Sequence, residues 1–212
     1  MPRPSQLAEK RRALLPTVAK AFSELGYRRA TTGELAARCG VGENILYRLW
    51  PDKKAMFIAA IGYVYDLSAE SWLRVLSRPD GERSTASRLL AHEADAMGTQ
   101  GHHRIVFAGL NETDDPEIRA ALAGMYQRYQ SFVRDQVMTH RQHQGRERPS
   151  RARSARPAPA RAASEDATAR AWAVIGLATV ANITRELGLL DDASRRRVMA
   201  RMGNLLLDAA AE

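Results

Sequence analysis

A short stretch of the chain, residues 43–48, carries side chains whose chemistry suits the recognition of nucleic-acid bases. Glutamate can accept a hydrogen bond from cytosine N4, and asparagine can pair with N6 and N7 of adenine. Glu43 and Asn44 are adjacent here, and Tyr47 and Arg48 follow one helical turn later. A helix over this stretch would therefore present all four side chains on one outer face.

Glu43 has a second interpretation. The first turn of the expected helix contains no lysine or arginine. A carboxylate in this position is also stabilised by the positive end of the helix dipole. Glu43 can therefore read a base or simply stabilise its own helix, and the sequence alone favours neither role.

The preceding residues predict a short helix and a tight turn that would position this stretch. Thr31 and Glu34 have capping-box spacing, so the Thr31 hydroxyl can accept from the Glu34 amide while the Glu34 carboxylate reaches back. Gly40 stands where the first helix should end, and glycine tolerates the left-handed conformation that such an end needs. Gly42 suits the N-cap of the following helix.

The second helix of the pair should bury its other side. Its inward-facing positions, at i, i+3 and i+4, are Leu46, Leu49 and Trp50. A helix–turn–helix motif places its second helix in the major groove of DNA. The pattern therefore predicts a DNA-binding head over residues 1–51.

The run from Ala13 to Ile61 resembles the DNA-binding domain of the TetR family of bacterial transcriptional regulators. The matching segments are AFSELGY at 21–27, the Thr31–Thr32 pair, LAARCGV at 35–41, LYR at 46–48, Trp50 and DKKAM at 52–56. This resemblance covers the first quarter of the chain. The remaining residues share the helical layout of the family more than its residues.

The resemblance implies a set of phosphate contacts and leaves the operator sequence undetermined. The family grips phosphates with the threonine pair, the recognition-helix tyrosine and the lysine that opens the next helix. Threonine is common where Ile45 stands and histidine where Leu49 stands, so two backbone contacts are expected to be missing. The predicted DNA-contact residues are Thr31, Thr32, Glu43, Asn44, Ile45, Tyr47, Arg48 and Lys53.

Positive charge is concentrated in two places along the chain. Of its 212 residues, 32 are lysine or arginine and 24 are acidic, which gives a formal net charge of +8. The first 54 residues carry 11 basic and 5 acidic side chains, and residues 140–163 carry 7 arginines and 1 glutamate. A basic head suits a polyanionic partner. The Arg- and Pro-rich residues 143–163 are predicted to be a flexible linker, with an auxiliary nucleic-acid tether as the alternative.

The chain is predicted to be all-α, with about nine helices, because strand-forming patterns are nearly absent. A disordered arm is expected at 1–6 and a first helix at 7–25. Pro16 lies inside this helix, so either the helix is kinked near Arg12 or its regular part begins near Pro16. Beyond the head, helices are expected at 52–77, 84–97, 102–110, 115–142, 164–187 and 192–210. Residues 52–212 would thus form a helical body.

The resemblance implies that this body contains a small-molecule pocket. Its candidate residues are Trp72, His92, Phe107, Tyr126, Tyr129, Phe132, Trp172 and Asn182. For each aromatic side chain, ordinary core packing is the simpler interpretation. A buried Asn182 would need hydrogen-bond partners, which a ligand or a second subunit could supply.

The resemblance also implies a homodimer, and the last two expected helices suit its interface. Within the expected helix 164–187, the stretch 171–183 is apolar nearly all round, so it needs burial on most sides. Small residues would let a partner helix approach closely, at Ala173, Gly176, Ala178 and Ala181. Residues 192–210 add a second apolar stripe, with Arg195, Arg196 and Arg197 on the outer face. We expect a four-helix interface between two subunits.

Other classes of protein find little support. Cys39 is the only cysteine, so an intramolecular disulfide and a cysteine-based zinc site are excluded. The N-terminus lacks the apolar core of a signal peptide and the run 171–183 is too short to span a bilayer, which predicts a soluble, cytoplasmic protein. Adjacent His102 and His103 make a poor metal pair, and no catalytic motif appears. We therefore expect no enzyme, no metal and no cofactor.

The sequence thus predicts a ligand-responsive transcriptional repressor that binds a pseudo-palindromic operator as a homodimer. An effector would release it by binding the DNA-incompetent state more tightly. The alternative is a helical interaction protein with a degenerate head, which the departures at Ile45 and Leu49 favour. The retained threonine pair, Tyr47 and Lys53 oppose that alternative.

Overall fold

The computed structural model describes residues 4–77, 88–89, 92–93, 101, 103–147 and 160–208, which are helical apart from short turns. The helices are α1 (Pro4–Arg29), α2 (Thr32–Arg38), α3 (Glu43–Leu49), α4 (Lys53–Leu76), α6 (His103–Leu110), α7 (Pro116–Glu147), α8 (Ala160–Glu186) and α9 (Asp192–Asp208). The prediction of an all-α chain is confirmed. Most of the helix expected at 84–97 lies outside the described residues. None of the described helices combines the length and the apolarity needed to cross a membrane.

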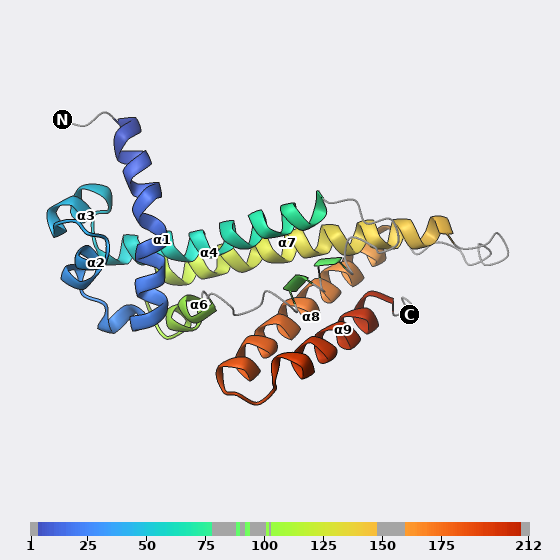
Figure 1. Cartoon of the computed structure of the whole chain (residues 1–212). Coiled ribbons are helices and arrows are strands. Elements are labelled where there is room, and N and C mark those ends of the chain that lie inside the picture. Colours follow the sequence, from blue (N-terminus) through green and yellow to red (C-terminus); the bar gives the residue numbers. More distant parts are fainter. Residues whose placement is uncertain are drawn as a thin grey trace. The chain divides into compact units, whose positions relative to one another are not determined.

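Two compact units share these helices, which Figure 1 labels. One unit comprises Met1–Ala69 and Gln100–Tyr126, and the other comprises Glu70–Thr99 and Gln127–Glu212. The residues predicted as the head, 1–51, therefore belong to a larger unit. That unit also includes the beginning of α4, all of α6 and the beginning of α7.

Aromatic side chains of α1 and α4 form the centre of the first unit. The ring centroid of Phe22 lies 5.0 Å from that of Phe57 and 6.3 Å from that of Tyr27, and Tyr27 and Phe57 are 4.8 Å apart. Helix α1 contacts α2, α3 and α6 around this centre. Fully buried side chains surround it, including Val18, Leu35, Leu46, Met56, Ile61, Ile105 and Ile118. The head helices are thus fixed by a shared core.

Helix α1 begins earlier than predicted. It starts at Pro4, so residues 4–6 of the expected arm are helical, whereas Arg3 lies outside the described residues. Pro16 lies within α1, so the helix begins well before this proline. The non-helical backbone within α1 is at Gly26, with φ 73° and ψ 167°, one residue after the predicted end. Only glycine adopts such a conformation without strain.

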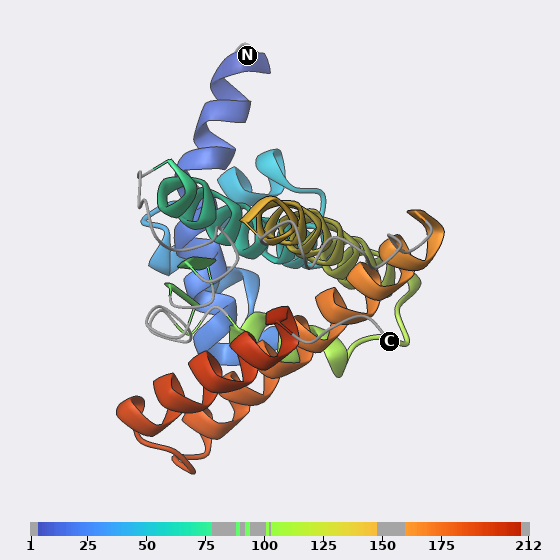
Figure 2. The ribbon, with the colours of Figure 1, turned by 90° about the vertical axis from the view of Figure 1, so that its right-hand side faces the viewer.

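In the second unit, α8 divides its apolar surface among different neighbours. Ala167 packs against Val137 of α7, and Ala181 packs against Met199 of α9. Helices α8 and α9 run side by side in both views of the ribbon (Figures 1 and 2). Ala181, expected to face a second subunit, therefore faces the same chain. Its neighbour α9 supplies the burial that the sequence pattern required.

Arg195 is a second correction in this pair. It was expected on the outer face of the last helix, but only 3% of its side chain is exposed. Its Nη1 lies 2.8 Å from Oδ1 of Asp192, three residues earlier on α9. The long aliphatic stem of arginine can be buried while its charged end finds a carboxylate at the surface.

Both ends of the predicted linker 143–163 are helical. Helix α7 continues to Glu147, and α8 already begins at Ala160, so the linker prediction is wrong at these ends. The helix-breaking residues of the segment, Pro149, Pro157 and Pro159, all lie between the two helices. Alanine and arginine favour helix up to those prolines. Residues 148–159 lie outside the described part of the chain.

Candidate nucleic-acid interface

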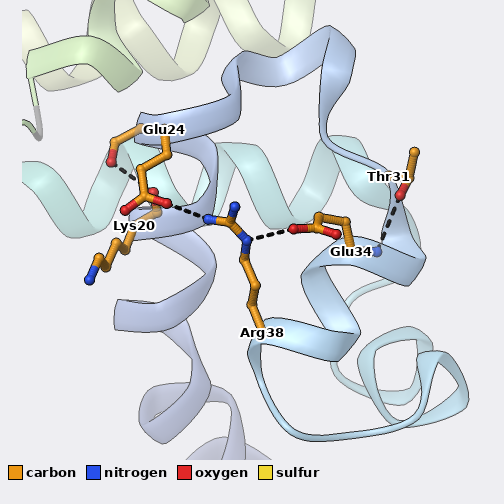
Figure 3. Close-up of polar contacts among 6 residues, drawn as sticks. Lys20, Glu24, Thr31, Glu34 and Arg38 are labelled. Carbon is orange, nitrogen blue, oxygen red and sulfur yellow. Dashed lines mark hydrogen bonds and ion pairs between the residues drawn. The ribbon is translucent and has the colours of Figure 1, made fainter.

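Local hydrogen bonds build the α2–turn–α3 motif much as the sequence predicts. The Thr31 hydroxyl accepts a hydrogen bond from the Glu34 amide at 3.2 Å, and Gly40 adopts φ 64° after α2 ends. Gly42 has extended backbone and is the N-cap of α3. The return half of the predicted capping box is replaced, because the Glu34 carboxylate accepts from Nε of Arg38 at 2.8 Å (Figure 3).

Arg38 also joins α2 to α1. Its Nη1 donates to the carboxylate of Glu24, so one guanidinium bridges two glutamates on different helices (Figure 3). The Arg38 side chain is 31% exposed, and those of Glu24 and Glu34 are more exposed still. Salt screens charge pairs in such positions. This bridge therefore orients α2 rather than supplying much of the stability of the unit.

Helix α3 has one buried and one exposed face, as predicted. Leu46, Leu49 and Trp50 are at most 3% exposed. The exposed side chains are those of Glu43, Asn44, Tyr47 and Arg48, and Ile45 is half-buried. The face that could meet DNA is therefore polar and accessible. Its contacts with DNA stay a prediction.

Three of the predicted DNA-contact residues form a hydrogen-bonded chain. The Thr32 hydroxyl donates to Oε2 of Glu43 at 2.7 Å, and the Tyr47 hydroxyl donates to the Thr32 oxygen at 3.2 Å. Glu43 thus has a role that sequence reasoning did not consider, since its carboxylate binds a hydroxyl predicted to contact a phosphate. Thr32 cannot donate its one hydroxyl hydrogen to a phosphate and to Glu43 at once.

Asn44 depends on the glycine two residues before it. A Cβ atom placed on Gly42 would lie 2.7 Å from Oδ1 of Asn44, closer than real side chains approach. A larger residue at position 42 would therefore displace the Asn44 side chain. The N-cap glycine gives space to the side chain predicted to read a base, and the sequence offered no signal for this.

Lys53 is anchored to the protein by two of its three ammonium hydrogens. Its Nζ donates to the carbonyl oxygens of Tyr27 at 3.0 Å and of Ala30 at 3.1 Å. The same nitrogen lies 4.5 Å from the centroid of the Tyr27 ring. An ammonium has three donors, so one hydrogen is left for a phosphate. The predicted phosphate contact is therefore also a clamp on the segment between α1 and α2.

Ion pairs connect the head helices to the α6–α7 segment of the same unit. Lys54 Nζ lies 3.3 Å from Asp115 and 3.1 Å from Glu117, and Arg28 Nε lies 2.7 Å from Glu112. The hydrogen bonds that the Lys54 ammonium donates to the carboxylates of Glu117 and Asp115 raise the pKa of Lys54. Asp115 also caps α7, because its Oδ1 accepts hydrogen bonds from the amides of Glu117 and Ile118. Its ion pair with Lys54 depends on a contact distant along the chain.

Cys39 lies at the C-cap of α2 as a half-buried, free thiol. Burial raises its pKa above the ordinary value for cysteine. A thiol that stays protonated at neutral pH is a poor nucleophile and a poor redox sensor. This environment suits a side chain that only fills space.

The candidate ligand residues separate into groups. Trp72, Tyr129 and Phe132 come together in the second unit, with the Trp72 ring centroid 5.4 Å from Tyr129 and 4.5 Å from Phe132. His92 joins them through Ser71, whose hydroxyl lies 2.5 Å from His92 Nε2. The sequence missed Glu93, whose carboxylate accepts a hydrogen bond from the Trp72 indole. A single charged residue without periodic partners gives no signal in the sequence.

The other candidates lie elsewhere. Phe107 and Tyr126 belong to the first unit, where Phe107 packs edge-on against His103 with ring centroids 5.7 Å apart. On α8, Trp172 is 48% exposed. Asn182 Nδ2 donates to the Ala178 carbonyl of its own helix, and its buried Oδ1 has no hydrogen-bond partner among the described residues.

Comparison with known sequences identifies relatives over part of the chain. Residues 15–60 match the family model described as bacterial regulatory proteins, tetR family. The chain is 25% identical over 84 residues to the uncharacterized HTH-type transcriptional regulator YuxN of Bacillus subtilis (strain 168), over 40% of this chain and 29% of that protein. It is 32% identical over 127 residues to the nucleoid occlusion factor SlmA of Pasteurella multocida (strain Pm70), over 58% of this chain and 62% of that protein. The chain thus spans less than two thirds of these curated relatives.

Solved structures resemble the chain over nearly its whole length. A putative TetR-family transcriptional regulator from Rhodococcus sp. has a TM-score of 0.70 at 17% identity, and the match covers 94% of this chain and 99% of that one. A putative transcriptional regulator from Saccharomonospora viridis, in complex with choline, has a TM-score of 0.68 at 17% identity, over 95% and 96%. AibR, in complex with isovaleryl coenzyme A and operator DNA, has a TM-score of 0.60 at 24% identity, over 91% and 97%. At such identities the likeness is one of fold.

Proposed function

The chain belongs to the TetR family of bacterial regulatory proteins, and we propose that it represses transcription from a pseudo-palindromic operator in the bacterial cytoplasm. Its fold is that of a DNA-binding transcriptional regulator. The proposal adds that two subunits bind the operator together. It also adds that a small-molecule effector releases them.

The outer face of α3 is the observation that carries this proposal. Asn44 can pair with adenine, and Glu43 can accept from cytosine once it leaves Thr32. Thr31, Tyr47 and the remaining hydrogen of Lys53 can meet phosphates on either side. A polar, exposed helix face beside hydroxyl and ammonium donors suits a major groove flanked by its backbone.

An exposed apolar surface on α8 and α9 supports the proposed homodimer. We call it the α8–α9 face, and its members are Trp172, Val180 and Ile183 of α8, Leu187 directly after α8, and Val198, Met202 and Leu205 of α9. Each of these side chains is 39–66% exposed. They recur at helical spacing, so each helix presents them as a stripe. Two copies of this surface could form a two-fold interface of four helices.

The effector is proposed to bind the second unit. Two solved relatives carry small molecules, namely choline in one and isovaleryl coenzyme A in AibR. In this chain, the aromatic side chains around Trp72 are the candidate site. An effector acts by binding the DNA-incompetent state more tightly than the competent one, which shifts the population away from the operator.

Selection from randomised duplex DNA, followed by gel shift, tests the proposal. We expect the full-length protein to enrich a two-fold symmetric site whose half-sites lie about one helical turn apart, roughly 34–36 Å. An enriched site without two-fold symmetry would contradict the homodimer model. Failure to enrich any site would favour the alternative, a helical interaction protein with a degenerate head.

A further inference from the structure

The second unit contains a cluster that combines aromatic rings with a carboxylate. We call it the acidic aromatic cluster, and it comprises Trp72, His92, Glu93, Tyr129 and Phe132. The Trp72 ring stacks on Phe132 with an angle of 21° between the planes and meets Tyr129 at 64°. Its Nε1 donates to Oε1 of Glu93 at 2.5 Å. One indole therefore contacts two other rings and the carboxylate.

Among the described residues, His92 is the only charged group that offsets the charge of Glu93. Desolvation by burial raises the pKa of this carboxyl group, and the hydrogen bond from Trp72 and the neighbouring His92 oppose the rise. Among the described residues, no lysine or arginine forms an ion pair with Glu93. Glu93 is half-buried, and a partly desolvated carboxylate without a cationic partner is costly. The cluster is therefore a place where an added positive charge would stabilise the protein.

The aromatic rings restrict the kind of cation that would fit. A ring face attracts a cation through its quadrupole, and quaternary ammonium groups are recognised in this way. Such a group has no N–H to donate, so Glu93 can keep its hydrogen bond from Trp72 and contribute charge alone. An anionic ligand would place like charges together, and a neutral ligand would leave the carboxylate uncompensated.

We propose that the acidic aromatic cluster binds an organic cation of the quaternary ammonium class. Glu93 supplies the charge, and Trp72, Tyr129 and Phe132 supply the ring surfaces. If the proposed function holds, this cation is the effector of the regulator. The binding site itself does not depend on that role.

A pair of probes with the same shape tests the inference on the full-length protein. Choline and its neutral carbon isostere, 3,3-dimethylbutan-1-ol, differ in the charge of one atom. Calorimetry and tryptophan fluorescence should show that choline binds at least about tenfold more tightly, which corresponds to about 1.4 kcal/mol. Equal affinity for the two probes would overturn the inference. So would the absence of binding by both choline and tetraethylammonium at millimolar concentration.

Substitutions locate the site within the cluster. Glu93→Gln keeps an oxygen that can accept from Trp72, and we expect it to remove the preference for choline over the isostere. Phe132→Leu should weaken choline binding by several-fold. Asp135→Asn is the matched control, because it neutralises an exposed carboxylate on α7, and it should change neither affinity. Unchanged choline binding by Glu93→Gln would contradict the proposal, and the two probes on the unaltered protein decide the matter if that variant does not fold.

Gel shifts separate this inference from the proposed function. Calorimetry with choline requires no DNA, so the cation site can be confirmed even if the protein selects no operator. If the protein binds an operator but shows no preference for choline, the regulator proposal stands and the cation site fails. If choline binds at the cluster but leaves operator affinity unchanged, the effector role is overturned.

Discussion

Helices α3 and α8 both leave one side uncovered, but the two uncovered sides differ in chemistry. Helix α3 exposes Glu43, Asn44, Tyr47 and Arg48, whereas α8 exposes tryptophan, valine and isoleucine side chains. Exposed polar groups form hydrogen bonds with water, so leaving this face of α3 without a partner costs little free energy. Exposed apolar surface costs about 25 cal/mol per Å² relative to burial. The comparison therefore favours reversible association at α3 and a permanent interface at α8.

Neighbouring residues on α8 give the largest expected effects. Ala181→Glu would place a carboxylate against Met199 inside the subunit, where an unpaired charge costs at least several kcal/mol, so we expect the second unit to unfold. Val180→Glu changes the exposed side instead, so we expect a folded monomer that has lost operator binding. Thermal unfolding and analytical ultracentrifugation distinguish the two results. A Val180→Glu protein that remains dimeric would place the interface elsewhere.

Asn44 tests whether the polar face of α3 reads bases. Asn44→Ala should lower specific affinity by roughly 1–3 kcal/mol and relax preference at one base pair, the range for a bidentate contact. Gly42→Ala should produce part of this effect, because its Cβ would displace the Asn44 side chain. Affinities for a panel of operator variants would measure both changes. An equal loss of affinity for every operator variant would show that Asn44 contacts the DNA backbone and does not read a base.

Glu93 tests the consequence of burial for a carboxyl group. Because its folded-state pKa is raised, Glu93 binds a proton more readily in the folded than in the unfolded protein. Below about pH 4.3, the ordinary glutamate value, both states are protonated, and stability is lost as pH rises through the folded pKa. We therefore expect Glu93→Gln to raise Tm at neutral pH and to approach the unaltered protein near about pH 4. A Tm difference independent of pH would contradict this account.

Glu43 is the exposed counterpart, and its effect should be the smallest. Glu43→Gln removes a charge from the surface that meets DNA and weakens the hold on the Thr32 hydroxyl. We expect affinity for nonspecific DNA to rise by roughly twofold to fivefold, the range of exposed charge interactions. Titrations at several salt concentrations would detect the change, which should shrink as salt increases. Lower nonspecific affinity would show that Glu43 assists docking.

Periodicity and capping chemistry predicted the local structure well. The faces of α3 follow from a repeat of 3.6 residues, and the cap at Thr31 follows from a hydroxyl that accepts a nearby amide. In these cases the partners are separated by a few residues. The sequence therefore contains the whole interaction.

Contacts between distant segments could not be predicted in this way. The partners of Lys53 are carbonyl groups of Tyr27 and Ala30, and carbonyls carry no residue-specific signal. The apolar run of α8 indicated burial. It did not indicate that α7 and α9 would each cover part of the helix while another side stayed exposed. The average composition of 143–163 concealed that its prolines lie in the middle.

The two hydrogen bonds of Lys53 limit which residues can replace it. Only four of the 32 basic residues are lysine, so arginine is the usual basic residue of this chain. Two of the four are Lys53 and Lys54, whose compact ammonium groups each contact two oxygen-bearing partners at short range. A planar guanidinium on a longer stem would not fit between the carbonyls of Tyr27 and Ala30 in the same way. Replacing Lys53 with arginine would therefore keep the charge but change the shape of the side chain.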